Sequence, residues 1–509
     1  MSQAAGEETL AVPGTVPTVL DPADGWVVAG VAVTAVATDL ALRSGALGLA
    51  GALLVLVAAV ALLACGRLAT WQARLVAAVA PVFGAFLAIR TSAWLLPLDL
   101  LAALGLLALG ASLARGGDVL DLTVPRVVMR AVHAVLHAMA APAFAAAPAR
   151  RAARRHLGEA GRAEAVLRVV GGVLLAVPLL LLLGFLLASA DAVFASFFRV
   201  DVDLASLAGH AAALAVGAWG AASLLRVTSV VPVGPLGPGR RMLGSIEAMI
   251  VLAGLAVLFA VFAATQVVAL SKGGRHVLAT AGLTYAEYAR SGFFQLLAVA
   301  VITLGVLLAL RALTDLEHPG RRRAFAVLAE VAVALTLVVV VVAIRRLDLY
   351  ERTFGLTMLR LYSELFSYWV GVVFLLLGCS LAGLGSRRAW FLGAAAAVGL
   401  ALLLALNVVN PEAVVVRHNL ARAPAAEAGS LDPAGRFDTA ERLDPAYLAG
   451  LSDDAVPTLV DRVPSLDPAA RAAVTARLCQ ERPAPRWTGW PAWNLGHARA
   501  RQRLAAFCP

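Results

Sequence analysis

Long apolar runs, separated by short polar and charged stretches, dominate the pattern of this chain. A helix needs about 20 residues to cross a hydrocarbon layer roughly 30 Å thick, because it rises about 1.5 Å per residue. The pattern therefore predicts an all-α fold, a polytopic bundle of about 11 transmembrane helices. The predicted spans are 26–42, 45–65, 75–90, 93–114, 166–188, 204–226, 245–270, 293–311, 325–345, 367–385 and 389–409.

Composition supports an integral membrane protein. Hydrophobic residues make up 61% of the 509 residues and charged residues only 15%, which lies outside the range of soluble globular domains. The formal net charge of +10 raises the alternative of nucleic-acid binding, but the arginines gather at the ends of apolar runs and no nucleic-acid module is visible. That placement is typical of orientation in a bilayer, so lipid is the partner we expect.

The distribution of basic residues predicts the orientation. With a cytoplasmic N-terminus, the connections 66–74, 115–168, 226–243, 311–323 and 386–388 hold 20 Lys and Arg residues, and the opposite set holds 10. Short cytoplasmic connections usually carry the excess. Residues 1–25 are expected to be a disordered segment without a removable signal peptide. An odd number of spans places the C-terminus outside the plasma membrane.

The connection 115–165 carries an amphipathic pattern. Arg126, Arg130, His133 and His137 share one helical face, and valines, Leu136 and Met139 occupy the rest. This arrangement predicts a basic helix lying in the cytoplasmic interface, where anionic lipid would attract it.

The last hundred residues, 410–509, form an extracytoplasmic region by this topology. We expect a loose linker over 411–440 and a small helical domain over about 440–509, because Leu-Asp-Pro-Ala recurs and Asp followed by Pro favours helix starts. Cys479 and Cys508 both fall in this region, where they either pair or remain free thiols.

Ionisable side chains within apolar runs are candidates for function because burying them in lipid is costly. Glu330 is one such residue and could form part of a proton or cation path, although an ion pair or a hydrogen bond between helices is the favoured interpretation. Asp191 closes the fifth run and either orients a solute or simply ends a helix. Hydrogen bonds between helices are the favoured interpretation for Gln266, Gln295, His210 and Asn407.

Two segments between runs, 272–294 and 345–369, are rich in tyrosine, carboxylate and guanidinium groups. An aromatic belt at the membrane surface explains the tyrosines. The alternating charges predict two interfacial helices joined by ion pairs, each preceded by Gly-Leu-Thr. The candidate functional residues of these segments are Glu287, Tyr288, Arg290, Arg352 and Tyr362.

Motifs for enzymes are lacking from the sequence. It contains no H-E-x-x-H, no P-loop, no G-x-S-x-G and no dinucleotide-binding glycine pattern. His133 and His137 are four residues apart but have no third ligand near them in sequence. We therefore expect no catalytic residue, no cofactor and no metal site.

Several stretches together resemble a known family: LLASADAVF at Leu186, GLTYAEYARSGFFQL at Gly282, RRLDLYERTFGLTMLRLY at Arg345, and LDPAYLAGLSDDAVPTL and WNLGHARARQRL in the tail. They resemble the DUF4153/DUF4173 family of uncharacterised bacterial integral membrane proteins, common in actinobacteria, over roughly residues 165–509. The resemblance implies a multispanning helical fold in a bacterial plasma membrane, and it carries no established activity.

Two leading functional hypotheses follow, and a membrane enzyme ranks third behind them. The first is a non-enzymatic envelope sensor or scaffold whose outer face is built from the two Gly-Leu-Thr segments and the tail, with an envelope protein as partner. The second is a transporter or flippase for a small solute or lipid, whose path would be lined by Glu330, Gln266, Gln295, Asp191 and Arg311. A shared polar cavity for Glu330 and Gln266 would favour transport.

Overall fold

The structure is a computed structural model that describes residues 25–119, 122–148, 204–229, 243–271, 292–316, 318–384, 389–427, 444–466, 468–481 and 489–508. Helices account for every regular element within these ranges, which confirms the all-α fold. The predicted span 166–188 and the expected disordered segment 1–25, apart from Gly25, lie outside the described residues.

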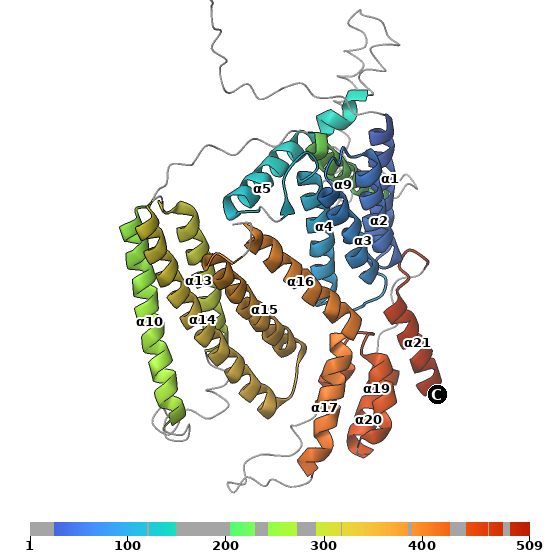
Figure 1. Ribbon diagram of the computed structural model, residues 1–509. Helices are drawn as coiled ribbons and strands as arrows, with labels where there is room; N and C mark the ends of the chain where they lie inside the picture. The colour runs from blue at the N-terminus through green and yellow to red at the C-terminus, as the bar shows by residue number, and fades with distance from the viewer. Residues whose placement is uncertain are drawn as a thin grey trace, which may run out of the picture.

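Helices α1 to α5 and α9 form the first bundle (Figure 1). Apolar residues of these helices share one core, which includes Leu62, Phe83, Leu107 and Leu225. The small residues Ala73, Ala77 and Ala80 are fully buried on one side of α3, which lets neighbouring helices approach closely. The helices are α1 (Gly25–Arg43), α2 (Leu49–Cys65), α3 (Trp71–Phe86), α4 (Leu96–Ser112), α5 (Val124–Met139) and α9 (Leu204–Ser229).

Helices α10 (Ser245–Ser271), α13 (Phe293–Leu313), α14 (Pro319–Phe354) and α15 (Met358–Leu381) form the second bundle, around a separate core. Helix α16 (Trp390–Val409) joins the two, as its diagonal course in Figure 1 shows. Phe391 and Ala395 near its start belong to the second core, and Leu403 near its end belongs to the first.

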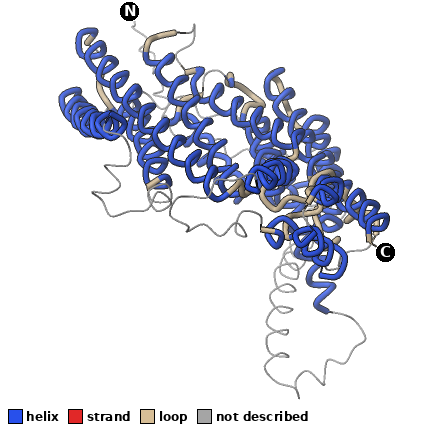
Figure 2. The backbone as a smooth tube through the Cα atoms, turned by 90° about the horizontal axis from the view of Figure 1, so that it is seen from below, coloured by secondary structure: helices blue, strands red, loops and turns tan. Residues whose placement is uncertain are grey.

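The tail forms a third body of short helices against the same end of both bundles (Figures 1 and 2). Its core contains Val415, Val416 and Leu459, and it also takes in Leu356 and Met358 from the α14–α15 connection. The helices are α17 (Pro411–Glu427), α18 (Pro445–Ala449), α19 (Val456–Arg462), α20 (Pro468–Ala476) and α21 (Leu495–Phe507), with one helical turn at Val463–Ser465 and another at Arg477–Glu481.

Helix α17 differs from the predicted linker. Residues 411–427 are helical because Asn410 and Pro411 act as a helix start: the Asn410 side chain accepts a hydrogen bond from the Ala413 N–H at 3.3 Å, and proline suits the first helical position. Asp444 caps α18 in the same way, accepting from the Tyr447 N–H at 2.9 Å. Cys479 and Cys508 form a disulfide bond, which resolves the open alternative for this pair.

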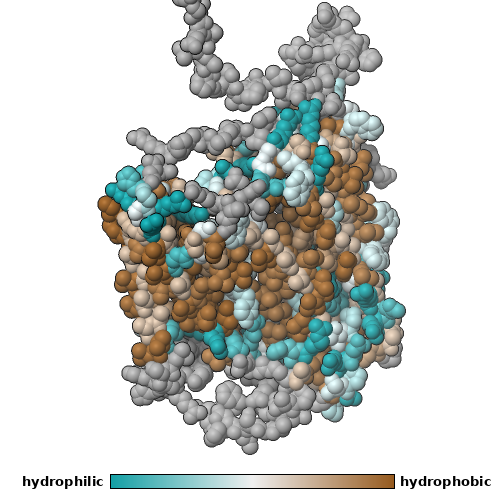
Figure 3. Space-filling model, in the orientation of Figure 1, coloured by the Kyte–Doolittle hydropathy of each residue, from teal (hydrophilic) through white to brown (hydrophobic). Residues whose placement is uncertain are grey.

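Membrane-spanning character is strong in seven described helices, α1, α9, α10, α13, α14, α15 and α16. Helices α2, α3 and α4 are apolar but only 17, 16 and 17 residues long, about 25 Å at helical rise. Helix α5 and the helix Ala141–Pro148, bent by 48°, count as one further span if taken together. The predicted total of about 11 is therefore not confirmed. Figure 3 shows a continuous apolar band between two polar edges.

Helix α14 corrects another prediction. The segment after Arg345 is not a separate interfacial helix, because α14 continues unbroken for 36 residues to Phe354. The chain turns at Gly355, whose φ of 76° favours glycine, and Thr357 then caps α15 by accepting from the Arg360 N–H at 3.4 Å. The guanidinium of Arg360 stacks 4.1 Å from the Tyr350 ring centroid.

Connections predicted to share a side of the membrane are indeed grouped in space. At one end, the Arg67 N–H donates to Thr228 Oγ1 at 3.2 Å, and Leu243 pairs with Thr314. At the other end, the Leu49 N–H donates to the carbonyl of Trp493 at 2.8 Å. The tail therefore lies beside the α1–α2 and α3–α4 connections, as the alternation of spans requires.

A close helix contact yields a test of the first bundle. A methyl group at Gly84 in α3 would lie 2.7 Å from Val55 Cβ in α2, whereas one at Gly105 in α4 would meet nothing within 4 Å. We expect Gly84→Ala to destabilise the protein by about 1–3 kcal/mol, and Gly105→Ala to be neutral or stabilising by up to about 1 kcal/mol. Thermal unfolding of the detergent-solubilised protein measures both; equal midpoints for the two variants would contradict this packing.

Candidate functional site

Four of the predicted site residues, Asp191, Glu287, Tyr288 and Arg290, lie outside the described residues. Arg352 lies in the last turn of α14, and its side chain is also outside the described set. Glu330 lies in α14, where Oε1 is buried without a hydrogen-bond partner and the carboxyl faces Gly378 of α15. Among the predicted residues that the structure describes, Tyr362 is the one that lies near a cluster of buried carboxyl groups.

Tyr362 lies in the first turns of α15, where it meets the first bundle. Its ring stacks on Trp94, with centroids 5.4 Å apart and an interplanar angle of 18°. The hydroxyl is buried without a hydrogen-bond partner. The carboxyls of Asp99, Glu412 and Asp454 all lie close enough to act on it electrostatically. These groups belong to one polar region, which we call the junction network, where α3, α4, α15, α16 and the tail meet.

Asp99 and Asn407 form the deepest part of the junction network. Both are 0% exposed, and Asn407 Nδ2 donates to Asp99 Oδ1 at 2.7 Å, joining α16 to α4. Arg90 follows α3, and its Nε donates to the Asn407 carbonyl at 2.8 Å. The guanidinium also reaches the Val408 carbonyl at 3.3 Å. A cation at the carbonyl end of a helix is favourable because that end carries a partial negative charge.

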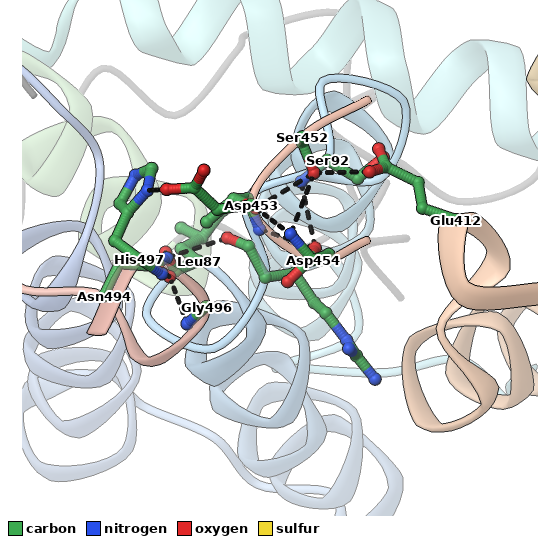
Figure 4. A network of polar contacts seen from close by, with 11 residues as sticks. Leu87, Ser92, Glu412, Ser452, Asp453, Asp454, Asn494, Gly496 and His497 are labelled. Carbon is green, nitrogen blue, oxygen red and sulfur yellow. Dashed lines mark hydrogen bonds and ion pairs between the residues drawn. The ribbon is translucent and has the colours of Figure 1, made fainter. Parts of the chain in front are cut away.

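Asp454 joins the tail to the start of α4 (Figure 4). One carboxylate oxygen accepts from the Thr91 N–H at 2.8 Å and from the Ser92 N–H at 3.1 Å. The Asp454 N–H donates to Thr91 Oγ1 at 3.0 Å, and the Asp454 carbonyl accepts from Asn410 Nδ2 at 2.8 Å. Both backbone groups and the side chain of Asp454 are thus bonded to membrane-helix ends.

Glu412 connects α17 to the same loop. Ser452 Oγ donates to Glu412 Oε2 at 2.6 Å, as Figure 4 shows. Burial raises the pKa of the Glu412 carboxyl, and the hydrogen bond from Ser452 opposes that shift. Burial likewise raises the pKa of Asp454, opposed by the Thr91 N–H and by the positive charge of Arg90. Desolvation therefore dominates both groups.

Asn494 docks helix α21 on the end of α3. Its Nδ2 donates to the carbonyls of Leu87 and Arg90 at 3.0 and 2.8 Å, and its Oδ1 accepts from the Gly496 N–H at 2.8 Å. The Leu495 and Gly496 N–H groups donate to the two carbonyls between, Ala88 and Ile89, at 2.8 and 3.2 Å. The amide end of one helix thereby satisfies the carbonyl end of another.

Space at this contact admits only glycine at position 496. A Cβ atom there would lie 2.6 Å from Asp454 Oδ1 and 2.8 Å from Thr91 Cγ2. Next to it, His497 Nδ1 lies 2.5 Å from Asp453 Oδ2, which joins α21 to the loop before α19 (Figure 4). Residues 452–454 and residues 494–497 therefore pack directly against each other.

The tail also bonds the second bundle. Asn419 of α17 forms two hydrogen bonds with the α14–α15 turn. Its Oδ1 accepts from the Leu356 N–H at 2.8 Å, and its Nδ2 donates to the Leu356 carbonyl at 2.7 Å. The Met358 N–H donates to the hydroxyl of Tyr447 at 2.7 Å. The same small domain therefore closes helix ends in both bundles.

The polar groups of this region are engaged mainly in contacts with helix ends. Within the described ranges, no three His, Cys, Asp or Glu side chains come together closely enough to hold a metal ion. The hydroxyls of Thr91 and Ser452, 3.0 Å apart, are engaged in helix-end contacts. The carboxyls and amides mainly satisfy backbone groups that a helix leaves unpaired.

Sequence reasoning missed most of this network. It singled out Tyr362, and it favoured a hydrogen bond between helices for Asn407, which is confirmed. The same interpretation is confirmed for His210, whose Nδ1 lies 2.8 Å from both Asp39 carboxylate oxygens across α9 and α1. Asp99 carried a usable signal, since it is a carboxylate within an apolar run. Asp454 and Asn494 carried none, because their partners are more than 350 residues away in sequence.

The residues suggested for a transport path do not gather in one place, as far as the structure describes them, and Asp191 lies outside the described ranges. Gln295 is exposed near the start of α13, and Arg311 lies 16 residues later in the same helix, about 24 Å along its axis. Arg311 Nη1 donates to Ser380 Oγ at 3.0 Å. Among the described residues, Glu330 Oε1 has no hydrogen-bond partner and therefore makes no bond to Gln266.

The fold and its apolar band define this class of molecule: a multispanning helical membrane protein with an extramembrane helical domain docked on its helix ends. The family model described as "Domain of unknown function (DUF4153)" matches residues 76–462. The match covers more than half of the chain, and the protein therefore belongs to the DUF4153 family. No curated protein and no solved structure matches the chain.

The extent of the match corrects the sequence-based estimate. The resemblance was placed at roughly 165–509, but the match begins at residue 76 and ends at 462. It therefore includes most of α3 and all of α4, with Arg90, Thr91 and Asp99, together with Asn407, Glu412 and Asp454. It leaves out α21 and Asn494.

Removing the donor function of Asn494 tests the docking of α21. Asn494→Asp keeps the oxygen that accepts from Gly496 and loses the two bonds to the Leu87 and Arg90 carbonyls. We expect a loss of stability of about 1–3 kcal/mol, because buried acceptors are left unpaired. The matched control Ser465→Ala removes an exposed 2.7 Å bond to the Arg462 carbonyl and should change little. Limited proteolysis of the full chain measures release of the tail; equal cleavage of both variants would contradict the docking.

The raised pKa values of Glu412 and Asp454 predict a pH dependence. Their stabilising contribution is complete below the ordinary values of 4.5 and 3.8, and it is lost as the pH rises through the raised values of the folded state. The tail should therefore resist proteolysis better at about pH 5 than at about pH 8. Glu412→Gln should flatten this trend, and Asp461→Asn, at an exposed site, should not. A trend of opposite sign would overturn the assignment.

Proposed function

We propose that the protein is a cell-envelope sensor or scaffold of the bacterial plasma membrane, whose docked tail presents a surface to an envelope partner. The observation that carries this proposal is the bonding of one extramembrane domain to helix ends of both bundles, through Asn494 and Asp454 on one side and Asn419 and Tyr447 on the other. A partner that moves the tail would act on both bundles, and a change between the bundles would move the tail.

An extracytoplasmic tail fits the proposal. The connections on the side opposite the tail carry 20 of the Lys and Arg residues in the short connections, against 10 on its own side. The disulfide bond between Cys479 and Cys508 also favours an oxidising compartment. Both observations support a cytoplasmic N-terminus.

Helix α5 supports contact with anionic lipid at the cytoplasmic face. None of its residues is buried, and Val128, Val132, Val135, Leu136 and Met139 are all exposed. Its polar side faces the first bundle: Arg130 donates to the Gly116 carbonyl at 3.1 Å, and Trp219 Nε1 donates to the Ala138 carbonyl at 2.8 Å. An exposed apolar face anchored beside basic residues is typical of helices in a lipid interface.

A transporter or flippase receives less support. Those of its suggested residues that the structure describes are spread along α10, α13 and α14, and Glu330 faces a packed neighbour at Gly378. Transport sites usually collect polar groups near the membrane midplane at interrupted helices.

Crosslinking in intact cells tests the sensor or scaffold role. A photoreactive amino acid at the exposed positions Ala472 and Gln502 in the tail should capture the same discrete envelope protein. The matched control places the photoreactive amino acid at Ala324, an exposed position near the start of α14 and far from the end that contacts the tail. This variant should not capture that protein. Single substitutions are preferable to deletion of the tail, because deletion would expose the ends of α2, α3 and α4. No adduct from either tail position, or identical adducts from Ala324, would contradict the proposal.

A further inference from the structure

Three buried oxygens of the junction network have no hydrogen-bond partner in the described part of the chain. Two belong to the hydrogen-bonded pair Asp99 and Asn407, and the third belongs to Tyr362, on which Asp99 acts electrostatically. Asp99 Oδ2 and Asn407 Oδ1 have no hydrogen-bond partner in the described part of the chain, although both side chains are 0% exposed. The bond of 2.7 Å between Asp99 Oδ1 and Asn407 Nδ2 keeps these two oxygens close together. The third is Tyr362 Oη, which is also buried and unpartnered.

The unpartnered oxygens of Asp99 and Asn407 require a positively charged or donating group. An ionised carboxylate and an amide oxygen only accept hydrogen bonds, so with Asp99 ionised its Oδ2 and Asn407 Oδ1 cannot satisfy one another. Leaving buried polar atoms unpaired costs about 1–3 kcal/mol each, and more for a charged group. A single species between them that interacts with several oxygens removes this cost.

The surrounding charge is negative. Asp99, Glu412 and Asp454 all act on the Tyr362 hydroxyl, and Arg90 is the basic group that acts on Asp99. The guanidinium of Arg90 is already bonded to the carbonyls of Asn407 and Val408. Its positive charge therefore acts on Asp99 and Asp454 from a fixed position, and it makes no hydrogen bond to the unpartnered oxygens.

We propose that Asp99 Oδ2, Asn407 Oδ1 and Tyr362 Oη bind one dehydrated monovalent cation of about the size of sodium. The Trp94 ring stacks on Tyr362 and holds the tyrosine ring in place beside the site. Oxygen ligands that replace a hydration shell are the usual means by which proteins hold such ions within membranes. This assignment stands apart from the partner proposed for the tail.

The ligand set favours a monovalent ion over a divalent one. Calcium and magnesium sites use several carboxylates, and calcium takes six to eight oxygens. Here one carboxylate lies at the site, and no cluster of three acidic, His or Cys side chains is found among the described residues. The location between α4, α15 and α16 places the ion where the two bundles and the tail meet.

Direct binding to the full-length protein tests the proposal. The purified protein in nanodiscs, in choline chloride at constant ionic strength, should bind ²²Na⁺ saturably, with about one ion per chain. Unlabelled NaCl should displace the label, and choline should not. In the same buffers NaCl should raise the unfolding midpoint by roughly 2 °C or more, because a ligand of the folded state stabilises it.

Three variants localise the site. Asp99→Asn should abolish ²²Na⁺ binding, and Tyr362→Phe, which keeps the ring on Trp94, should raise the half-saturating concentration about tenfold. Glu330→Gln, which changes another carboxyl with a buried unpartnered oxygen, should bind as the wild type does. If Asp99→Asn fails to fold, the Tyr362→Phe and Glu330→Gln pair still decides the question.

Several results would overturn the proposal. One is the absence of saturable ²²Na⁺ binding to the wild type, and another is binding unchanged by Asp99→Asn or by Tyr362→Phe. A third is an unfolding midpoint that changes with pH but is the same in NaCl, KCl and choline chloride. That result would show that a proton or a water molecule, and not sodium, occupies the site. The carboxyls that would then change protonation are Asp99, Glu412 and Asp454, and Tyr362, Arg90 and the Asp453–His497 pair lie beside them.

Discussion

The need to satisfy backbone groups at helix ends organises this molecule. An α-helix leaves four N–H groups and four carbonyls without internal partners, and lipid supplies none. Here the ends of the membrane helices are closed by the tail, through the Asn494 amide on α3, the Asp454 carboxylate before α4, and the Asn419 amide on the α14–α15 turn. Carbonyls of Pro491 and Trp493 close the start of α2 in the same manner. The tail is therefore a structural part of the membrane body.

This constraint explains why the polar residues of the junction network are buried where they are. Asp454, Glu412 and Asn494 are between 2% and 6% exposed, yet most of their polar atoms meet a backbone group or a hydroxyl. Asp99, Asn407 and Tyr362 differ, because an oxygen on each remains without a partner. Fully satisfied polar groups fix one arrangement of the helices, whereas the unsatisfied oxygens mark the place where a ligand would contribute. The hydrogen bonds that hold the helices and the proposed ion site are thus adjacent but use different atoms.

Much of the fold could be predicted from the sequence, because apolar runs and their helical ends are local properties. Ten of the eleven predicted runs coincide with a described helix, and the alternation of their ends correctly grouped the connections. The length of α14 and the helicity of 411–427 were missed, since both depend on capping: Gly355 ends α14 and Asn410 begins α17. The docking of α21 depends on partners some 400 residues away, which no local pattern encodes. Tyr362 was selected for its place in a charged aromatic segment; its contact with Trp94 and the three carboxyls became visible only in the fold.

Hydrogen exchange, followed by mass spectrometry on the full-length protein in nanodiscs, tests the central claim most directly. The amides of Leu495 and Gly496 donate to α3, those of Leu49 and Ala50 donate to the tail, and those of Thr91 and Ser92 donate to Asp454. If the tail closes the helix ends, peptides covering 489–497, 48–52 and 87–95 will all exchange slowly, and Asn494→Ala will release protection in the three together. Rapid exchange of 489–497 while 48–52 and 87–95 stay protected would show that the membrane helices do not depend on the tail.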